Sequence, residues 1–245
     1  MKIAVIISGQ PRFTNNPNCF ASQKQKVFNQ GDVDVFAHLW AAKDNNYVSS
    51  SWSGMAACPA EKNDIQNFVD KWGYTILCQE FERQFSNPEL FAKIKERFPE
   101  PHWVESDFNK ALSHLYSLEK AITLFEEYQS YKEYDWVVVL RTDVCIWEFP
   151  DLSMLKKNHF YYSSIFHPEH FADICFITSP EYISGLKAYS YLMDPSHKIV
   201  EKLLKPCGEQ FKKEAFIDKF TREPLTQIPL PVRVVRNNES KGNQW

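Results

Sequence analysis

Two charged residues directly follow an uninterrupted apolar run in this sequence. Residues 137–140 are Val-Val-Val-Leu, and Arg141 and Asp143 come immediately after them. Consecutive apolar, mostly β-branched residues are typical of a strand that is buried on both faces of a sheet. In open α/β sheets, ligands bind at the edge formed by the carboxyl ends of the strands. The spacing therefore predicts a guanidinium and a carboxylate at a ligand-binding edge.

The spacing supports two interpretations of Arg141 and Asp143 equally. In the first, Asp143 binds a hard cation, Mg²⁺ or Mn²⁺, which also binds the phosphates of a nucleotide. One or two protein carboxylates are enough for Mg²⁺, because water and phosphate complete its shell. In the second, the two side chains form an ion pair that ties the strand end to a neighbouring loop.

A loop that contains a glycine, Ser8-Gly9-Gln10-Pro11-Arg12, follows a second apolar run at residues 3–7. Gly9 has no side chain, so a ligand can approach the backbone there. Arg12 supplies a planar set of donors that suits a diphosphate. Taken alone, a simple turn with a surface arginine explains the loop better. The sequence has no GxGxxG and no GxxxxGK[ST] motif, which argues against a Rossmann dinucleotide site and a P-loop.

Asp173 and His38 are two further candidates. Asp173 precedes the apolar run 174–177 and could act as the general base for an acceptor hydroxyl. An aspartate that caps a strand is a slightly better explanation on spacing alone. His38 ends the strand-like segment 33–38. A single histidine is more often structural than a ligand, but its predicted place at the same edge as Arg141 makes it a substrate-binding candidate.

Strand and helix patterns alternate through the first 140 residues, which indicates a mostly parallel sheet with helices on both faces. The clearest helix runs from residue 106 to 128, because its apolar residues recur at spacings of three and four. The expected strands are residues 3–7, 33–38, 74–78, 136–140, 160–165, 174–178 and 232–235. The expected helices are residues 20–30, 64–72, 106–128 and 209–220, with a further one that starts at Pro180. Residues 41–59 are expected to form an irregular loop.

The length of 245 residues fits a single α/β domain. We expect residues 1–145 to form a nucleotide-binding half, residues 146–236 an acceptor-side half, and residues 237–245 a polar tail.

The composition is that of an ordinary globular protein, with 44% hydrophobic and 24% charged residues. The net charge of −3 and the lack of a basic run argue against nucleic acid as a partner. The six cysteines show no metal-ligand spacing, which favours a reducing compartment. No run approaches the roughly 20 apolar residues of a membrane span. We therefore expect a soluble, cytoplasmic protein without a membrane span.

Five segments of the sequence resemble, in order, the motifs of small GT-A-type glycosyltransferase-like proteins of bacteria and viruses. Residues 6–12 (IISGQPR), 33–40 (VDVFAHLW) and 134–143 (YDWVVVLRTD) are similar to an SGQxR first loop, a DVFxHxW second strand and an RxD strand end. Residues 113–121 (SHLYSLEKA) and 172–180 (ADICFITSP) are also similar to that family's pattern. The resemblance covers residues 2–192.

The resemblance implies a GT-A-like (Rossmann-like) fold that binds a nucleotide sugar. Asp143 would occupy the place of the metal-binding aspartate in the usual DxD motif, with Mn²⁺ or Mg²⁺ as the cofactor. Arg141 stands where that motif has its first acid. Either Arg141 itself neutralises part of the diphosphate, or Asp143 suffices with water completing the metal shell. The substrate-binding residues would be Ser8, Gly9, Gln10, Arg12, His38 and Arg141.

The leading hypothesis is therefore a glycosyltransferase of glycan biosynthesis. It would move a sugar from a nucleotide-diphosphate donor to a hydroxyl acceptor, a glycan or a related molecule. Arg141 would stabilise the charge on the departing diphosphate, and Asp173 would be the acceptor-side base if the enzyme inverts. The alternative is a catalytically silent nucleotide- or glycan-binding domain with the same fold.

Overall fold

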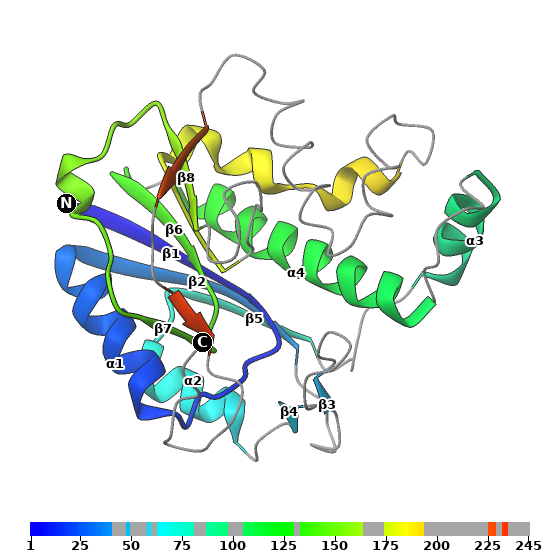
Figure 1. The fold of residues 1–245 in the computed structure, drawn as a ribbon, viewed down its shortest axis with the longest axis horizontal. Coiled ribbons are helices and arrows are strands. Elements are labelled where there is room, and N and C mark those ends of the chain that lie inside the picture. Colours follow the sequence, from blue (N-terminus) through cyan, green and yellow to red (C-terminus); the bar gives the residue numbers. More distant parts are fainter. Residues whose placement is uncertain are drawn as a thin grey trace.

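The computed structural model describes residues 1–40, 48–49, 58–59, 63–80, 87–97, 105–129, 133–163, 174–193, 225–228 and 232–234. Within these residues, seven strands form the central sheet: β1 (Lys2–Gly9), β2 (Asp32–Trp40), β5 (Ile76–Glu80), β6 (Trp136–Leu140), β8 (Phe160–Ser163), β9 (Cys175–Thr178) and β10 (Leu225–Ile228). Their order across the sheet is β10-β8-β9-β6-β1-β2-β5 (Figure 1).

The sheet is mostly parallel, as the sequence predicts. β6, β1, β2 and β5 are parallel neighbours, and β10 is parallel to β8. β9 pairs antiparallel with both β6 and β8, so it is the reversed strand among the seven. The predicted nucleotide-binding half supplies β1, β2, β5 and β6, and the predicted acceptor-side half supplies β8, β9 and β10. Both halves therefore contribute to one sheet, and the boundary between them stays a prediction.

Helices cover both faces of the sheet, because successive side chains of a strand point to opposite faces. On β1, Ile3, Val5 and Ile7 belong to one buried core, together with Phe68 and Trp72 of α2 (Asp64–Trp72). α1 (Pro17–Lys26) lies on this same side of the sheet (Figure 1). The opposite core joins α4 (Glu105–Gln129) to the sheet through Ala4, Ile6, Leu118, Ala121, Ile122 and Phe125. The predicted α/β architecture is confirmed.

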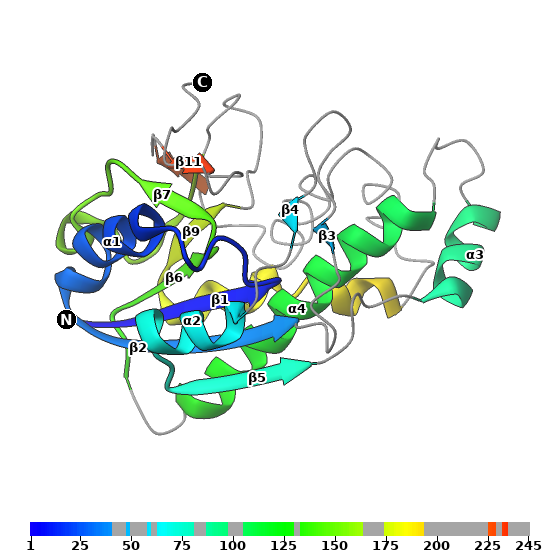
Figure 2. The ribbon, with the colours of Figure 1, turned by 90° about the horizontal axis from the view of Figure 1, so that it is seen from below.

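The first half of α4 extends past the carboxyl ends of β1 and β2 (Figure 2). α3 (Pro88–Arg97), which the sequence does not predict, packs there against α4. Leu90 and Ile94 of α3 form a separate small core with Phe108 and Leu112 of α4. The described part of α4 therefore reaches from the middle of the sheet to a region beyond its carboxyl edge.

Some predicted elements differ from the structure. The segment after Ser179 forms two 3₁₀ helices, η3 (Pro180–Leu186) and η4 (Tyr189–Met193), because its turns close through three-residue bonds such as Tyr182 N–H to the Ser179 carbonyl. Two pieces of the predicted irregular loop pair as short antiparallel strands, β3 (Val48–Ser49) and β4 (Cys58–Pro59). The predicted helix 209–220 lies outside the described residues.

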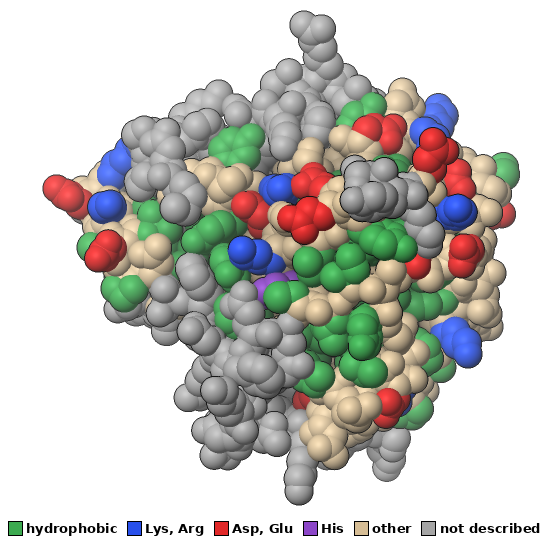
Figure 3. Space-filling view, turned by 180° about the vertical axis from the view of Figure 1, so that it is seen from behind, with side chains coloured by type: hydrophobic (Ala, Val, Ile, Leu, Met, Phe, Trp, Pro, Cys, Tyr) green, Lys and Arg blue, Asp and Glu red, His purple; other side chains and the backbone are tan. Residues whose placement is uncertain are grey.

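Basic and acidic side chains are interspersed on the face drawn in Figure 3, with apolar side chains between them. This mixture matches the small net charge of −3. Among the described residues, no helix combines the length and the apolar character needed to cross a membrane.

Candidate functional site

The carboxyl ends of three parallel strands meet at one edge of the sheet. Ser8 of β1 pairs with His38 of β2, and Ile7 of β1 pairs with Leu140 of β6. Arg141 therefore leaves β6 at the level of Ser8. The sequence-based prediction that the first loop, His38 and Arg141 share an edge is confirmed. This is the edge at which open α/β sheets bind ligands.

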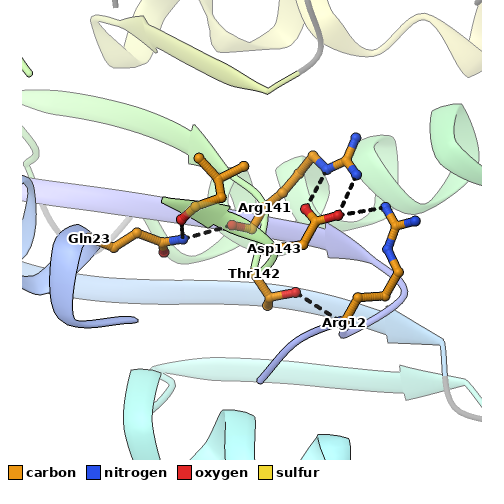
Figure 4. Close-up of polar contacts among 6 residues, drawn as sticks. Arg12, Gln23, Arg141, Thr142 and Asp143 are labelled. Carbon is orange, nitrogen blue, oxygen red and sulfur yellow. Dashed lines mark hydrogen bonds and ion pairs between the residues drawn. The ribbon is translucent and has the colours of Figure 1, made fainter. Parts of the chain in front are cut away.

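At this edge Asp143 lies between two arginines (Figure 4). Arg141 donates to it twice, from Nε to Oδ1 at 2.8 Å and from Nη2 to Oδ2 at 2.7 Å. Arg12 Nη2 lies 3.1 Å from Oδ2 of the same carboxylate. Of the two interpretations of the spacing, the ion pair between Arg141 and Asp143 is the one that the structure contains, and Arg12 from the first loop joins it.

The cluster of Arg12, Arg141 and Asp143, called here the arginine cluster, joins two guanidinium groups to one carboxylate. The Asp143 side chain is only 3% exposed, whereas the side chains of Arg12 and Arg141 are 21% and 19% exposed. The negative group is therefore buried, and the two positive groups lie on its solvent side. Paired guanidinium groups with fixed geometry suit a phosphate or diphosphate.

Buried polar contacts hold the turn that carries Asp143. Gln23 of α1 donates from Nε2 to the carbonyl oxygens of Arg141 at 2.9 Å and of Val144 at 2.8 Å. The backbone N–H of Arg12 donates to Oγ1 of Thr142 at 3.0 Å. These contacts tie α1 and the first loop to the end of β6, so the two arginines are held on the same carboxylate.

The strand that follows Asp143, β7 (Val144–Ile146), is also held by α1. β7 starts directly after Asp143 and pairs antiparallel with β11 (Val232–Val234). Its backbone is held by α1, because Ser22 Oγ accepts from Ile146 N–H at 3.0 Å. β11 agrees with the predicted strand 232–235, whereas β7 is too short to show a periodic pattern.

A second group of contacts joins the first loop to β2 through α4. Gly9 has a φ of +94°, a conformation that favours glycine, and no described atom lies within 4 Å of the place of a Cβ. Its N–H donates to Ser117 Oγ at 2.7 Å. Ser117 Oγ donates to the carbonyl oxygen of His38 at 2.9 Å. The conformation of the first loop is therefore fixed by Ser117, which lies 108 positions after Gly9 in the sequence.

These contacts also assign the protonation of the His38 ring. His38 is fully buried, and its Nδ1 lies 2.8 Å from Ser117 Oγ. A hydroxyl has one proton, and Ser117 gives it to the carbonyl of His38. Nδ1 must therefore carry a hydrogen and donate it to Ser117. His38 is a residue that positions the strand end and the first loop, and direct contact between it and a substrate stays a prediction.

Two buried donors near this edge have no hydrogen-bond partner among the described residues. They are Nε2 of Gln10, in the first loop, and Nε1 of Trp40, at the end of β2. Buried N–H groups normally find an acceptor. Within the described residues, both groups therefore lack the acceptor that a buried donor normally has.

Comparisons with known proteins do not assign this chain to a family. The sequence matches no family model and no curated protein sequence. Among solved structures, the chain is similar to a glycosyltransferase involved in the glycosylation of the major capsid of PBCV-1. The two are 11% identical with a TM-score of 0.38, and the match covers 94% of this chain and 82% of that chain. A likeness at this level does not establish a shared fold or activity.

Three residues that position the site were not predicted from the sequence: Gln23, Thr142 and Ser117. Thr142 and Ser117 lie inside the motif-like segments 134–143 and 113–121, but their partners are distant in the sequence, so the motifs alone do not indicate this role. Trp72 belongs with them, because its Nε1 donates to Gln23 Oε1 at 2.9 Å and orients the amide. Asp173, the predicted base, lies outside the described residues and stays a prediction.

The surroundings of Asp143 do not fit a divalent cation. Both of its carboxylate oxygens accept hydrogen bonds from guanidinium groups. A guanidinium group has no lone pair to offer and cannot be a metal ligand. Within the described ranges, no three His, Cys, Asp or Glu residues come together in a way that could hold a metal ion.

Proposed function

We propose that this protein is a glycosyltransferase, which moves a sugar from a nucleotide-diphosphate donor to a hydroxyl group of a glycan or a related acceptor. The observation that carries this proposal is the arginine cluster at the carboxyl edge of the mostly parallel sheet. Its two guanidinium groups are oriented by one buried carboxylate.

A diphosphate is the ligand chemistry that suits this cluster best. Arginine presents several N–H donors in one plane, and phosphate oxygens accept such donors in pairs. Arg12 and Arg141 come from two neighbouring strand ends, so a diphosphate could lie across both. The buried donors of Gln10 and Trp40 extend the same edge with groups that require oxygen acceptors.

The reaction breaks the bond between the anomeric carbon of the donor sugar and the diphosphate oxygen. A new bond forms between that carbon and the acceptor oxygen, and the acceptor proton passes to a base, for which Asp173 is the candidate. Negative charge accumulates on the departing diphosphate. Arg12 and Arg141 would stabilise that charge, and oriented cations at such a position are among the largest contributions to catalysis.

The test starts with a panel of nucleoside diphosphates and nucleotide sugars in thermal-shift and calorimetric binding assays. At about one hundred times its dissociation constant, a matched ligand adds about 2.7 kcal/mol to the free energy of unfolding. Release of nucleoside diphosphate from the matched nucleotide sugar, alone and with glycan acceptors, then reports transfer or slow hydrolysis. Arg12→Gln and Arg141→Gln should lose both binding and turnover.

A catalytically silent nucleotide-binding domain is the second candidate, since the arginine cluster explains binding without requiring a reaction. The two candidates differ in one measurement. Binding of a nucleotide sugar with no release of nucleoside diphosphate, across donors and acceptors, supports the silent domain. If no member of the panel binds, both proposals are wrong.

A further inference from the structure

We propose that the arginine cluster binds the diphosphate without a divalent cation at Asp143. In this proposal Asp143 is a positioning residue that holds Arg12 and Arg141, and the two guanidinium groups take the place of the metal. The inference rests on the proposed function, because it concerns how the donor diphosphate is bound at the same site.

Both carboxylate oxygens of Asp143 already accept from guanidinium groups. Oδ1 of Asp143 accepts from Arg141 at 2.8 Å, and Oδ2 accepts from Arg141 at 2.7 Å and lies 3.1 Å from Arg12 Nη2. A metal ion binds carboxylate oxygen at about 2.0–2.2 Å. It would have to sit against two guanidinium groups that are already bound to the same oxygens, and like charges repel strongly at that range.

Asp143 also has little room for a hydrated ion. The Asp143 side chain is 3% exposed, and the two arginines lie on its solvent side. Mg²⁺ gives up its water reluctantly and usually keeps several water ligands. A carboxylate buried behind two guanidinium groups is poorly suited to a hydrated ion.

The positive charge at this edge is permanent. Arginine stays protonated in proteins, so Arg12 and Arg141 each bring a fixed positive charge next to Asp143. Their donors are therefore in place before the ligand arrives.

Hydrogen bonds from α1 and to the first loop hold the backbone of the arginine cluster. Gln23 is fully buried and binds the carbonyl oxygens on both sides of Asp143, at Arg141 and Val144. Thr142 accepts the backbone N–H of Arg12. These contacts fix the backbone from which both arginines extend. A cation that displaced the guanidinium groups would have to break an arrangement supported from both sides.

The experiment measures the dissociation constant of the matched nucleoside diphosphate by calorimetry, once in EDTA and once in excess Mn²⁺ or Mg²⁺. We expect the constant to change less than about tenfold between these conditions. In EDTA, Arg12→Gln and Arg141→Gln should each weaken binding about tenfold or more. Lys157→Gln is the matched control and should leave the constant unchanged, because Lys157 pairs with the half-exposed Asp135 at the amino end of β6, the end opposite to Arg141.

The outcomes separate this inference from the proposed function. Binding that disappears in EDTA and returns with Mn²⁺ would overturn the inference and leave the glycosyltransferase proposal standing. No binding of any nucleoside diphosphate in either condition would overturn the proposed function itself. The Asp143→Asn variant gives a second readout: binding should weaken equally in EDTA and in Mn²⁺, whereas loss of the Mn²⁺ response in this variant alone would identify Asp143 as a metal ligand.

Discussion

Arg141 and Asp143 are separated by one residue, yet their side chains meet in two hydrogen bonds of 2.8 and 2.7 Å. Both residues follow the last residue of β6, where the chain turns toward β7. The pair therefore forms within a single turn. Arg12 then completes it from the neighbouring loop, so a local ion pair becomes part of a cluster that joins two strand ends.

The first prediction tests the geometry of this pair. Arg141→Lys keeps the positive charge but cannot make two parallel bonds to Asp143. We expect nucleoside diphosphate to bind at least about tenfold more weakly, which corresponds to about 1.4 kcal/mol. Calorimetric titration measures it.

Lys157→Arg is the control for this change, because Lys157 forms an ion pair with Asp135 in which both side chains are about half exposed, at 51% and 49%. Exposed pairs contribute little, so its binding constant should match that of the unchanged protein. An Arg141→Lys variant that binds as tightly as the unchanged protein would show that charge alone is sufficient at this position.

The second prediction concerns Gln23, which is fully buried and makes three side-chain hydrogen bonds. Gln23→Leu has a similar shape but leaves the carbonyl groups of Arg141 and Val144 and the indole N–H of Trp72 unpaired. An unpaired buried polar group costs about 1–3 kcal/mol. We expect the free energy of unfolding to fall by about 3 kcal/mol in urea titrations.

Gln66→Leu provides the comparison for that substitution. Gln66 also lies on a helix, α2, but it is exposed, and its amide donates to the exposed Asp70 at 2.7 Å. Its replacement should change the free energy of unfolding by no more than about 0.5 kcal/mol. Equal effects of the two substitutions would contradict the role assigned to Gln23.

The third prediction concerns Ser117, which links Gly9 to His38. Ser117→Ala removes the acceptor of the Gly9 N–H and of the His38 ring. We expect a loss of about 2 kcal/mol in the free energy of unfolding. We also expect weaker nucleoside diphosphate binding, because the first loop loses its anchor. Denaturant titration and calorimetry measure the two effects.

Ser190→Ala is a suitable control, since Ser190 is exposed and its hydroxyl donates to the Lys187 carbonyl at 2.8 Å. It should change neither the stability nor the binding constant. If Ser117→Ala lowered stability without any effect on binding, the link between α4 and the first loop would be purely structural.

The fourth prediction is a loss of stability at high pH caused by a buried thiol. Burial raises the pKa of Cys175, which begins β9 and is fully buried. In the unfolded chain a cysteine ionises at about pH 8.5. Above that pH the unfolded state releases the proton and the folded state keeps it, so stability falls as pH rises. By pH 10 the decrease from this thiol should be about 2 kcal/mol.

Urea titrations at pH 7 and pH 10 measure this effect. Cys175→Ala should be less stable at pH 7, but its decrease between the two pH values should be about 2 kcal/mol smaller. Ile177→Val, in the same strand, is the control, because it creates a small cavity without changing a titratable group. The same decrease in all three proteins would mean that Cys175 does not cause the pH dependence.

The sequence by itself determined the elements whose signals are local. The uninterrupted apolar run predicts β6 at residues 136–140, and the structure has Trp136–Leu140. The three- and four-residue spacing predicts α4 at 106–128, and the structure has Glu105–Gln129. Alternation of these elements also predicts a mostly parallel sheet, in which Ser8, His38 and Arg141 share one edge. The pairing of β1 with β2 and β6 places them there.

Only the tertiary structure decided how the residues at that edge are held. The spacing left Arg141 and Asp143 equally compatible with an ion pair and with a metal site. For Arg12, the loop taken alone favoured a surface arginine over a ligand-binding one. The deciding contacts join residues that are distant in the sequence. Arg12 and Thr142 are 130 positions apart, and Gln23 and Arg141 are 118 positions apart. Hydrogen bonds depend on distance and angle in space. A pattern along the chain reports which faces are buried, but it does not report which buried polar groups meet.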